Sequence, residues 1–347
     1  MVATEQFMTL PEVRRAGLRN IPREVWDYVS GGAETETTLR RNRRAMSHWV
    51  FRPRVLRDVS QIDISTTFLG MPLALPVMVA PMGSLCLVHP EGDVAMARAT
   101  GRMGTIHWMS TMTASPPEEV AAAATGPLIF QLYFRGDNAW AERIFRRIEA
   151  AGFRALALTV DSAAYGRRER DIERRIDFRN HAHGLEVADD RARQASLTWK
   201  DVEWLRQATP LPLILKGIET AEDARLAVEH GVQVVYVSNH GGRQIDHAPA
   251  TIESLPEIVE AVAGRAEVIV DGGFQRGTDV LKALALGARA VCIGKAAAWG
   301  LAAAGEEGVV RTLELLALEL RIAMANTGQA RIADLSPALV RRACHAV

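Results

Sequence analysis

The stretch that decides the fold is P-L-I-L-K-G-I-E-T-A-E-D-A-R-L-A-V-E-H-G-V-Q-V-V-Y-V-S, which runs from Pro212 to Ser238. It contains two short apolar runs, Pro212–Lys216 and Gln233–Ser238, separated by an amphipathic segment, Thr220–His230, with helical periodicity. The runs are apolar on both faces, which is typical of parallel strands covered by helices. The stretch therefore predicts one strand–helix–strand unit of an α/β protein.

The same pattern repeats along the rest of the chain. The predicted strands are Pro76–Ala80, Thr105–Ser110, Leu128–Tyr133, Ala155–Val160, Pro212–Lys216, Gln233–Ser238, Glu267–Asp271 and Ala290–Gly294. The predicted helices are Glu91–Arg102, Pro116–Ala124, Asn138–Ala150, Thr198–Gln207, Thr220–His230, Ile252–Val262, Gly277–Leu286 and Glu306–Ala325. Eight repeats predict a closed (β/α)8 TIM barrel. An open doubly wound sheet would favour Gly-x-Gly-x-x-Gly after the first strand, where this chain has A-P-M-G-S-L.

We expect residues 1–347 to form a single barrel domain, a length that one TIM barrel commonly reaches. Residues 1–70 form a short helical N-terminal extension, with an amphipathic helix near Ile21–Ser30. The arginine-rich segment Leu39–Arg44 is predicted to be a solvated helix face. The interval 174–196 lacks apolar periodicity and is predicted to be a mobile active-site loop.

Composition limits the classes of partner. The 41 basic and 41 acidic residues balance, so charge gives no reason to expect nucleic acid. The cysteines Cys86, Cys292 and Cys344 lack the spacing of a disulfide framework or a zinc site, and we predict no metal. The 18-residue uncharged run 71–88 contains three prolines and predicts a strand with turns rather than a membrane span. With no signal-peptide pattern at the N-terminus, we expect a soluble cytoplasmic protein.

Polar residues and glycines follow nearly every predicted strand. They are Gly83, Ser110, Gln131, Tyr133, Thr159, Asp161, Arg168, Lys216, Ser238, His240, Arg243, Asp271, Gly272, Gly273, Gly294 and Lys295. A single histidine or lysine at a strand end is often only hydrogen-bonded or solvated. In a TIM barrel, however, these strand ends meet on the face that carries the chemistry, so their convergence predicts an active site.

The glycine pair Gly272-Gly273 precedes a predicted helix at Gly277, and Gly294-Lys295 follows the next strand. Glycine lets the backbone approach an anion closely, and the amides of a helix N-terminus favour negative charge. The alternative is that the glycines only make the turn. The position after the last two strands, where this fold commonly binds phosphate, favours a phosphate site.

The motif S-N-H-G-G-R-Q, residues 238–244, closely resembles the signature of the FMN-dependent 2-hydroxy acid oxidase and dehydrogenase family. The resemblance extends from about Phe7 to Leu339 and includes W-D-Y-V-S-G-G-A-E, F-Q-L-Y, A-L-T-V-D, G-R-R-E-R-D and L-K-G-I. It implies a TIM barrel that binds FMN and oxidises an (S)-2-hydroxy acid to a 2-oxo acid, with oxygen or another acceptor reoxidising the flavin. The family is commonly homotetrameric.

The resemblance also implies roles for individual residues. His240 would act as base with Asp161 as its partner, and the substrate would lie among Tyr28, Tyr133, Arg168 and Arg243. Two guanidiniums suit a carboxylate, and a carboxylate beside a histidine fixes its tautomer. The family's cofactor contacts map to Pro81, Met82, Gly83, Ser110, Gln131, Tyr133, Thr159, Lys216, Ser238, Asp271, Gly272, Gly273, Gln275, Arg276, Gly294 and Lys295. Whether the base takes its proton from the substrate carbon or from its hydroxyl stays open.

The chain departs from the family pattern at several positions. Gln275 and Lys295 stand where arginine is usual at the FMN phosphate, and the neighbouring Arg276 is a candidate replacement. Met112 stands where tryptophan is common, which predicts a reshaped apolar pocket. The interval 174–196 is shorter than usual. These departures keep two alternatives open: a non-catalytic flavin- or phosphate-binding barrel, and another flavin-dependent barrel enzyme.

Overall fold

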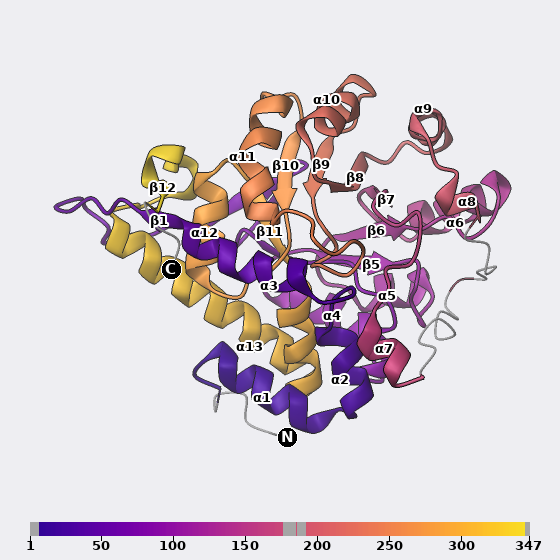
Figure 1. Cartoon of the computed structure of the whole chain (residues 1–347), viewed down its shortest axis with the longest axis horizontal. Helices are drawn as coiled ribbons and strands as arrows, with labels where there is room; N and C mark the ends of the chain where they lie inside the picture. Colours follow the sequence, from indigo (N-terminus) through magenta and orange to yellow (C-terminus); the bar gives the residue numbers. More distant parts are fainter. Residues whose placement is uncertain (1–6, 176–184, 186–191, 344–347) are drawn as a thin grey trace.

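The computed structural model describes residues 7–175, 185 and 192–343. Eight parallel strands form a closed barrel in the centre of the molecule (Figure 1). They are β4 (Val77–Val79), β5 (His107–Ser110), β6 (Leu128–Leu132), β7 (Leu156–Thr159), β8 (Leu213–Ile218), β9 (Val234–Val237), β10 (Glu267–Val270) and β11 (Ala290–Ile293). Neighbours in sequence are neighbours in the barrel, and β11 closes onto β4 with Val291 opposite Val77. The predicted (β/α)8 barrel is confirmed, strand by strand.

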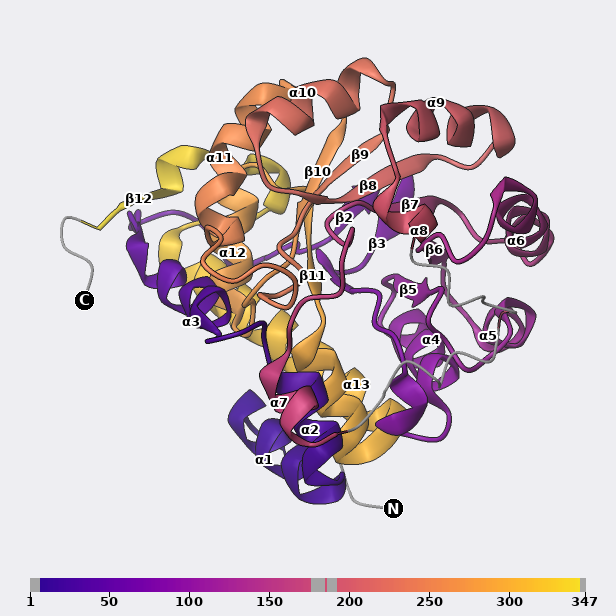
Figure 2. The ribbon, with the colours of Figure 1, turned by 45° about the vertical axis from the view of Figure 1, so that its right-hand side comes forward.

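A ring of helices covers the outside of the barrel (Figure 2). It contains α4 (Gly92–Arg102), α5 (Pro117–Ala123), α6 (Asn138–Ala150), α9 (Trp199–Ala208), α10 (Ala221–Glu229), α11 (Thr251–Val262), α12 (Gly277–Ala285) and α13 (Lys295–Thr327). The shorter helices are η3 (Leu85–Leu87), α7 (Glu169–Glu173), α8 (Ala192–Ala195), η5 (Ile332–Asp334) and η6 (Pro337–Leu339). The predicted helices are all present, and apart from the start of α13 their ends differ by a few residues.

Helix α13 is longer than predicted and is broken inside. Ala304 and Gly305 leave helical geometry, and Gly305 has a φ of +60° with His89 against it. The first half of α13 was not predicted because it is apolar on nearly all sides, so it carries no helical polar–apolar alternation. Its residues are almost all buried.

The inside of the barrel is a packed core. The Trp108 ring meets the Tyr236 ring edge-on, with 5.3 Å between the centroids, and Phe68 lies against Trp108 at 6.0 Å. Phe68 belongs to a hairpin of β2 (Thr66–Phe68) and β3 (Met71–Leu73), which contributes Phe68, Met71 and Leu73 to this core. The hairpin lies at the N-terminal ends of the barrel strands, where the Leu69 amide donates to the side chain of Glu267, the first residue of β10.

The N-terminal extension is helical, as predicted, and contains α1 (Leu10–Asn20), α2 (Arg23–Ser30), α3 (Thr37–Arg44) and η2 (Ala45–His48). Strand β1 (Trp49–Phe51) then pairs with β12 (Val340–Arg342) near the C-terminus. The prediction that Leu39–Arg44 is only a solvated face is wrong in part. Arg41 and Arg43 donate hydrogen bonds to the backbone oxygens of Ala248 and Gly273 in the barrel loops, because α3 lies across them.

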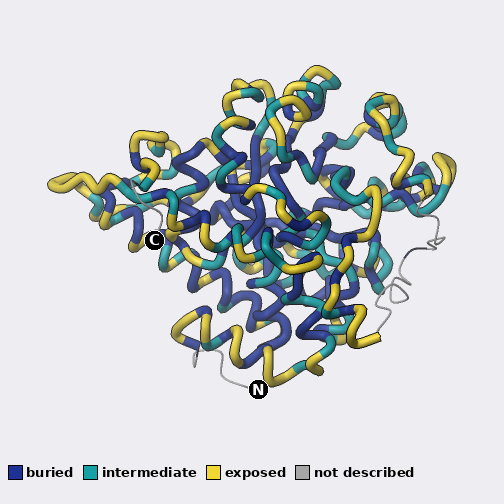
Figure 3. The backbone as a smooth tube through the Cα atoms, in the orientation of Figure 1, coloured by how far each residue is buried: buried dark blue, intermediate teal, exposed yellow. Residues whose placement is uncertain are grey.

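Figure 3 shows that burial is concentrated in the barrel and on the inner faces of its helices. No helix in the described ranges is long and apolar enough to cross a membrane. The predicted loop 174–196 falls largely outside the described residues. Its described end contains α8, in which the buried Gln194 accepts a hydrogen bond from the Phe134 amide.

Candidate active site

One large cavity opens at the C-terminal ends of the barrel strands. Residues after β4, β5, β6, β7, β9, β10 and β11 line it together with Lys216 of β8, and α2 and α3 cover one side. Its lining includes Tyr28, Pro81, Met82, Gly83, Ser110, Met112, Tyr133, Arg168, Lys216, His240, Arg243, Asp271, Gly272, Gly273, Gln275, Gly294 and Lys295. The structure thus brings together most of the residues predicted from the strand ends.

His240 owes its position to a tight turn after β9. His240, Gly241 and Gly242 have φ angles of +58°, +65° and +76°, a run of left-handed backbone that glycine adopts without cost. The His240 amide donates to the Ser238 hydroxyl at 3.1 Å. Gly242 lies against α3 so closely that a Cβ would be 2.5 Å from the Leu39 nitrogen. The two glycines therefore let the loop fold back and aim His240 into the cavity.

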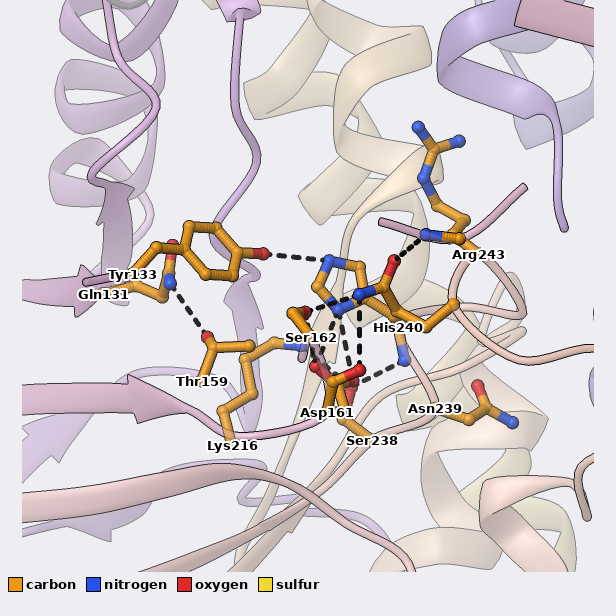
Figure 4. A network of polar contacts seen from close by, with 12 residues as sticks. Gln131, Tyr133, Thr159, Asp161, Ser162, Lys216, Ser238, Asn239, His240 and Arg243 are labelled. Carbon is orange, nitrogen blue, oxygen red and sulfur yellow. Dashed lines mark hydrogen bonds and ion pairs between the residues drawn. The ribbon is translucent and has the colours of Figure 1, made fainter. Parts of the chain in front are cut away.

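The imidazole of His240 is held from two sides (Figure 4). Its Nδ1 lies 3.1 Å from both carboxylate oxygens of Asp161, and its Nε2 lies 3.1 Å from the Tyr133 hydroxyl. With the proton on Nδ1, facing Asp161, Nε2 is left as the acceptor. Burial lowers the pKa of His240 and outweighs Asp161, which raises it. The free histidine is therefore set up as a neutral base.

Asp161 follows β7 and is held against β8. Gly217 has a φ of +110°, and a Cβ there would lie 2.7 Å from the Asp161 Cβ, so only glycine admits the carboxylate here. Ser162 donates to the Asp161 carboxylate at 3.0 Å. Although burial alone would raise it, the pKa of Asp161 is lowered by His240 and Lys216. Asp161 is an ionised partner for His240.

Two arginines lie beside the histidine. Arg243 donates through Nη1 to the backbone oxygens of Tyr28 and Gly31, at 2.6 and 3.0 Å, and its guanidinium lies 5.2 Å from the centre of the Tyr28 ring. The Nε of Arg168 donates to the Arg243 carbonyl at 3.3 Å. Burial, and then the charge of Arg168, lowers the pKa of Arg243. Two guanidiniums on one wall, with Arg168 buried and Arg243 half-buried, favour an anionic ligand.

Sequence reasoning missed two residues in this region. Tyr165 contacts Arg168 through its hydroxyl and places its ring 4.2 Å from the guanidinium. Asp171 in α7 faces both arginines, and burial raises its pKa. A tyrosine in a loop without periodicity gives no signal, because only the folded loop brings it to Arg168.

The groups predicted to contact a flavin ring form two buried chains. In the first, Ser110 donates to Gln131 at 2.7 Å and Gln131 donates to Thr159 at 2.8 Å. In the second, Lys216 donates to Ser238 at 2.9 Å and Ser238 donates to Asp271 at 2.8 Å. Both chains lie at the strand ends, and their hydroxyl, amide and ammonium groups suit a polar heteroaromatic ring.

Gly83 sits beside Met112 after β4. A Cβ on Gly83 would be 2.8 Å from the Met112 Cβ, and the Ser84 amide donates to the Met112 carbonyl at 2.8 Å. Pro81 and Met82 complete this wall of the cavity. The methionine therefore fits closely next to a residue without a side chain.

The predicted phosphate end lies between β10, β11 and α3. Gly272 and Gly273 have φ angles of +104° and +84°, and a Cβ on Gly273 would lie 2.8 Å from the Asn42 oxygen. Lys295 donates to the Gly241 oxygen at 3.1 Å, and burial lowers its pKa to about 7. Gly272 and Gly273 thus make the turn after β10, and the same two glycines form part of the predicted phosphate site.

Arg276 and Arg43 differ from expectation at this end. Arg276 pairs with Glu319 of α13 at 2.8 Å and is not among the residues that line the cavity. Arg43 of α3, read as solvated from sequence, lines the cavity and pairs with Asp279 at 2.6 Å. The sequence around Arg43 does not indicate that α3 contributes a cation to this end of the cavity.

The residues present fit FMN. Buried polar chains at one end of the cavity match a ring with several hydrogen-bonding edges, and Lys295, Arg43 and the close glycines at the other end match a phosphate. A Cβ on Gly294 would meet nothing nearer than 3.6 Å, so the backbone there is open to a ligand.

Comparison with known proteins decides the family. The pattern of the FMN-dependent dehydrogenase family matches residues 18–342. The chain is a member of this family. It is thus an FMN-dependent oxidoreductase, and the FMN predicted from sequence is confirmed as its cofactor.

Relatives of this family member align over nearly its whole length. Glycolate oxidase 1 of Oryza sativa subsp. indica is 44% identical over 96% of this chain and 95% of its own. A peroxisomal (S)-2-hydroxy-acid oxidase of Oryza sativa subsp. japonica is 46% identical over 94% and 93%. A mandelate oxidase structure with benzoyl-formic acid has a TM-score of 0.92 and 40% identity, covering 99% of this chain and 100% of its own.

Proposed function

We propose that the protein oxidises an (S)-2-hydroxy acid to the 2-oxo acid and passes the electrons through FMN to oxygen or another acceptor. The observation that carries the proposal is the position of His240, held by Asp161 and Tyr133 beside the two arginines Arg168 and Arg243. A base and an anion clamp on one wall are the two elements that a hydroxy acid requires.

In this proposal Arg243 and Arg168 bind the substrate carboxylate. Arg243 uses Nη1 for the carbonyls of Tyr28 and Gly31, which orients its remaining N–H groups. A guanidinium offers donors in a fixed planar arrangement that matches a carboxylate. Tyr28 and Tyr133 place hydroxyl groups on the same cavity. Burial raises the pKa of Tyr133, so its hydroxyl remains a donor.

His240 accepts a proton during the oxidation. Oxidation of a CH–OH group removes two protons and two electrons, and Nε2 of His240 takes one of the protons while Asp161 stabilises the imidazolium. FMN, when bound, would take up the two electrons together with the second proton. Lys216 places a buried positive charge where the ring is proposed to bind, and such a charge favours the reduced form. Kinetic isotope effects test whether the proton on His240 comes from the substrate carbon or from its hydroxyl.

The function is tested with a panel of 2-hydroxy acids. We expect glycolate, lactate or mandelate to bleach the flavin absorbance when mixed anaerobically with the holoenzyme. The same acids assayed with oxygen and with an artificial dye identify the acceptor. Absence of bleaching by every acid in the panel contradicts the proposal.

The cofactor site has an expected pH dependence that comes from Lys295. Burial, then Arg243 and Arg168, lowers the pKa of Lys295 to about 7, so the free protein loses this charge as the pH rises. A bound phosphate raises this pKa again. The affinity for FMN should therefore fall, by up to about tenfold per pH unit between about pH 7 and pH 9, as measured by fluorescence titration.

Lys295→Arg is the matched control, because a guanidinium stays charged across this range. Its affinity for FMN should be nearly constant between those pH values. Equal slopes for the wild type and Lys295→Arg would exclude Lys295 as the titrating group.

The arrangement of the site argues against the two alternatives that the sequence left open. A non-catalytic flavin-binding barrel has no use for a base aimed at the ligand, and a flavin-dependent isomerase has no use for two arginines on one wall. A protein that binds FMN but whose flavin no hydroxy acid reduces would restore the first alternative. Reduction by another class of substrate would restore the second.

We further propose that residues 1–347 form one domain that assembles as a cytoplasmic homotetramer. The loop 52–58 is exposed throughout, with Val55 81% and Leu56 103% exposed, which favours burial against another subunit. Among the described residues, Cys292 is a buried free thiol, which suits a reducing compartment. Light scattering tests the assembly, and cell fractionation tests the location, since two relatives are named peroxisomal.

A further inference from the structure

Beneath the proposed flavin site, four buried side chains form a single network. Lys216 and Asp271 line the cavity, and Ser238 and Tyr236 lie behind them, each 0% exposed. The Tyr236 hydroxyl donates to Oδ2 of Asp271 at 2.9 Å, and the Ser238 hydroxyl donates to Oδ1 at 2.8 Å. Both carboxylate oxygens of Asp271 thus have a hydroxyl donor.

This arrangement holds Lys216 and Asp271 in a long ion pair that has no direct hydrogen bond. The Nζ of Lys216 lies 3.8 Å from Oδ2 of Asp271, beyond hydrogen-bonding distance, and it donates to the Ser238 hydroxyl at 2.9 Å. The ammonium also lies 5.2 Å from the centre of the Tyr236 ring. Tyr236 therefore contacts the cation with its ring and the anion with its hydroxyl.

We propose that Tyr236 is a positioning residue that keeps Asp271 from closing onto Lys216 in a direct hydrogen-bonded pair, so that more of the lysine charge acts on the flavin. The proposal rests on the proposed function in one respect, that Lys216 faces the flavin ring. Tyr236 itself belongs to the barrel core and does not line the cavity. It acts only through Asp271 and Lys216.

The physical reason is the cost of leaving a buried carboxylate oxygen without a donor. Without the Tyr236 hydroxyl, Oδ2 of Asp271 would lack its hydrogen-bond donor, and a small movement would bring the Lys216 ammonium across the 3.8 Å gap to replace it. A paired lysine stabilises negative charge on a reduced flavin less well, because the carboxylate offsets its field. Burial raises the pKa of Tyr236 well above its usual value, so the hydroxyl remains a donor at all working pH values.

The test is Tyr236→Phe, which removes one oxygen and keeps the ring. The FMN midpoint potential is measured by dye equilibration during chemical reduction, with no hydroxy acid present. We expect the preference for reduced over oxidised FMN to fall about tenfold, which lowers a two-electron potential by about 30 mV. An unchanged or higher potential overturns the proposal.

Two further variants separate this effect from a loss of packing. Trp108→Phe alters the ring that packs on Tyr236 but leaves the Asp271 hydrogen bonds in place, and its potential should match the wild type. Asp271→Asn removes the competing charge, and its potential should rise. We therefore expect the FMN midpoint potential to fall in Tyr236→Phe and to rise in Asp271→Asn.

Asp271→Asn also keeps the proposal testable if Tyr236→Phe does not bind FMN. A potential that Asp271→Asn leaves unchanged or lowers shows that the carboxylate does not oppose Lys216 and overturns the proposal. Because the measurement contains no hydroxy acid, it stands even if no acid in the panel bleaches the flavin. Failure here and failure of the proposed function are therefore distinct results.

Discussion

Replacing His240 with glutamine is expected to leave FMN bound and to slow flavin reduction by a hydroxy acid by about 10²- to 10⁴-fold. Glutamine can keep a hydrogen bond to Asp161 or to Tyr133, so the loop after β9 should retain its shape. It cannot accept the substrate proton as imidazole does. The rate of flavin bleaching in anaerobic stopped-flow measures the effect, and the visible spectrum reports bound FMN.

The matched control is His247→Gln, the same exchange in the same loop. His247 is exposed and lies 3.9 Å from Asp246, away from the cavity lining. We expect its bleaching rate to equal that of the wild type. Bleaching at the wild-type rate in His240→Gln would remove His240 from the role of base.

Arg243→Met is expected to lower kcat/KM by about 10²- to 10⁴-fold. The methionine loses two hydrogen bonds to the substrate carboxylate, and each such bond to a charged group contributes about 1.5–3 kcal/mol. Arg243→Lys should fall between Arg243→Met and the wild type, because an ammonium keeps the charge but not the planar pair of donors. Steady-state assays over a range of substrate concentrations separate the effect on KM from that on kcat.

Arg243 also bonds the Tyr28 and Gly31 carbonyls, so FMN content must be measured in each variant. Arg167→Met is the control, since Arg167 is next to Arg168 in sequence and its side chain is 66% exposed. We expect it to leave kcat/KM near the wild-type value. Equal losses in Arg167→Met and Arg243→Met would contradict a specific carboxylate contact.

The architecture could be predicted because its signal is local. Each strand is a short apolar run buried on both faces, and each barrel helix has a polar and an apolar side, so periodicity identifies both. The first half of α13 could not be predicted as a helix, because burial on all sides removes that periodicity. The residues at the strand ends could be grouped because a barrel places those ends together.

The parts that could not be predicted depend on contacts between distant segments. Arg43 belongs to a run of arginines that resembles a solvated helix, and only the packing of α3 on the β10 loop directs it to the cavity. Arg276 looked available to a phosphate, yet Glu319, 43 residues further on, holds its guanidinium. Tyr236 belongs to an apolar strand, and only the fold brings its hydroxyl to Asp271.

The sequence by itself determined the barrel, the face that carries the chemistry, the family and the residue types in the site. Tertiary structure alone decided which nitrogen of His240 faces Asp161 and which faces Tyr133, which cations reach the phosphate end, and that Tyr236 contacts both Lys216 and Asp271. The physical reason is that periodicity and turn chemistry act over a few residues and are written in the sequence. Hydrogen bonds and buried charges depend on distances of about 3 Å between side chains far apart in the chain, which only packing sets.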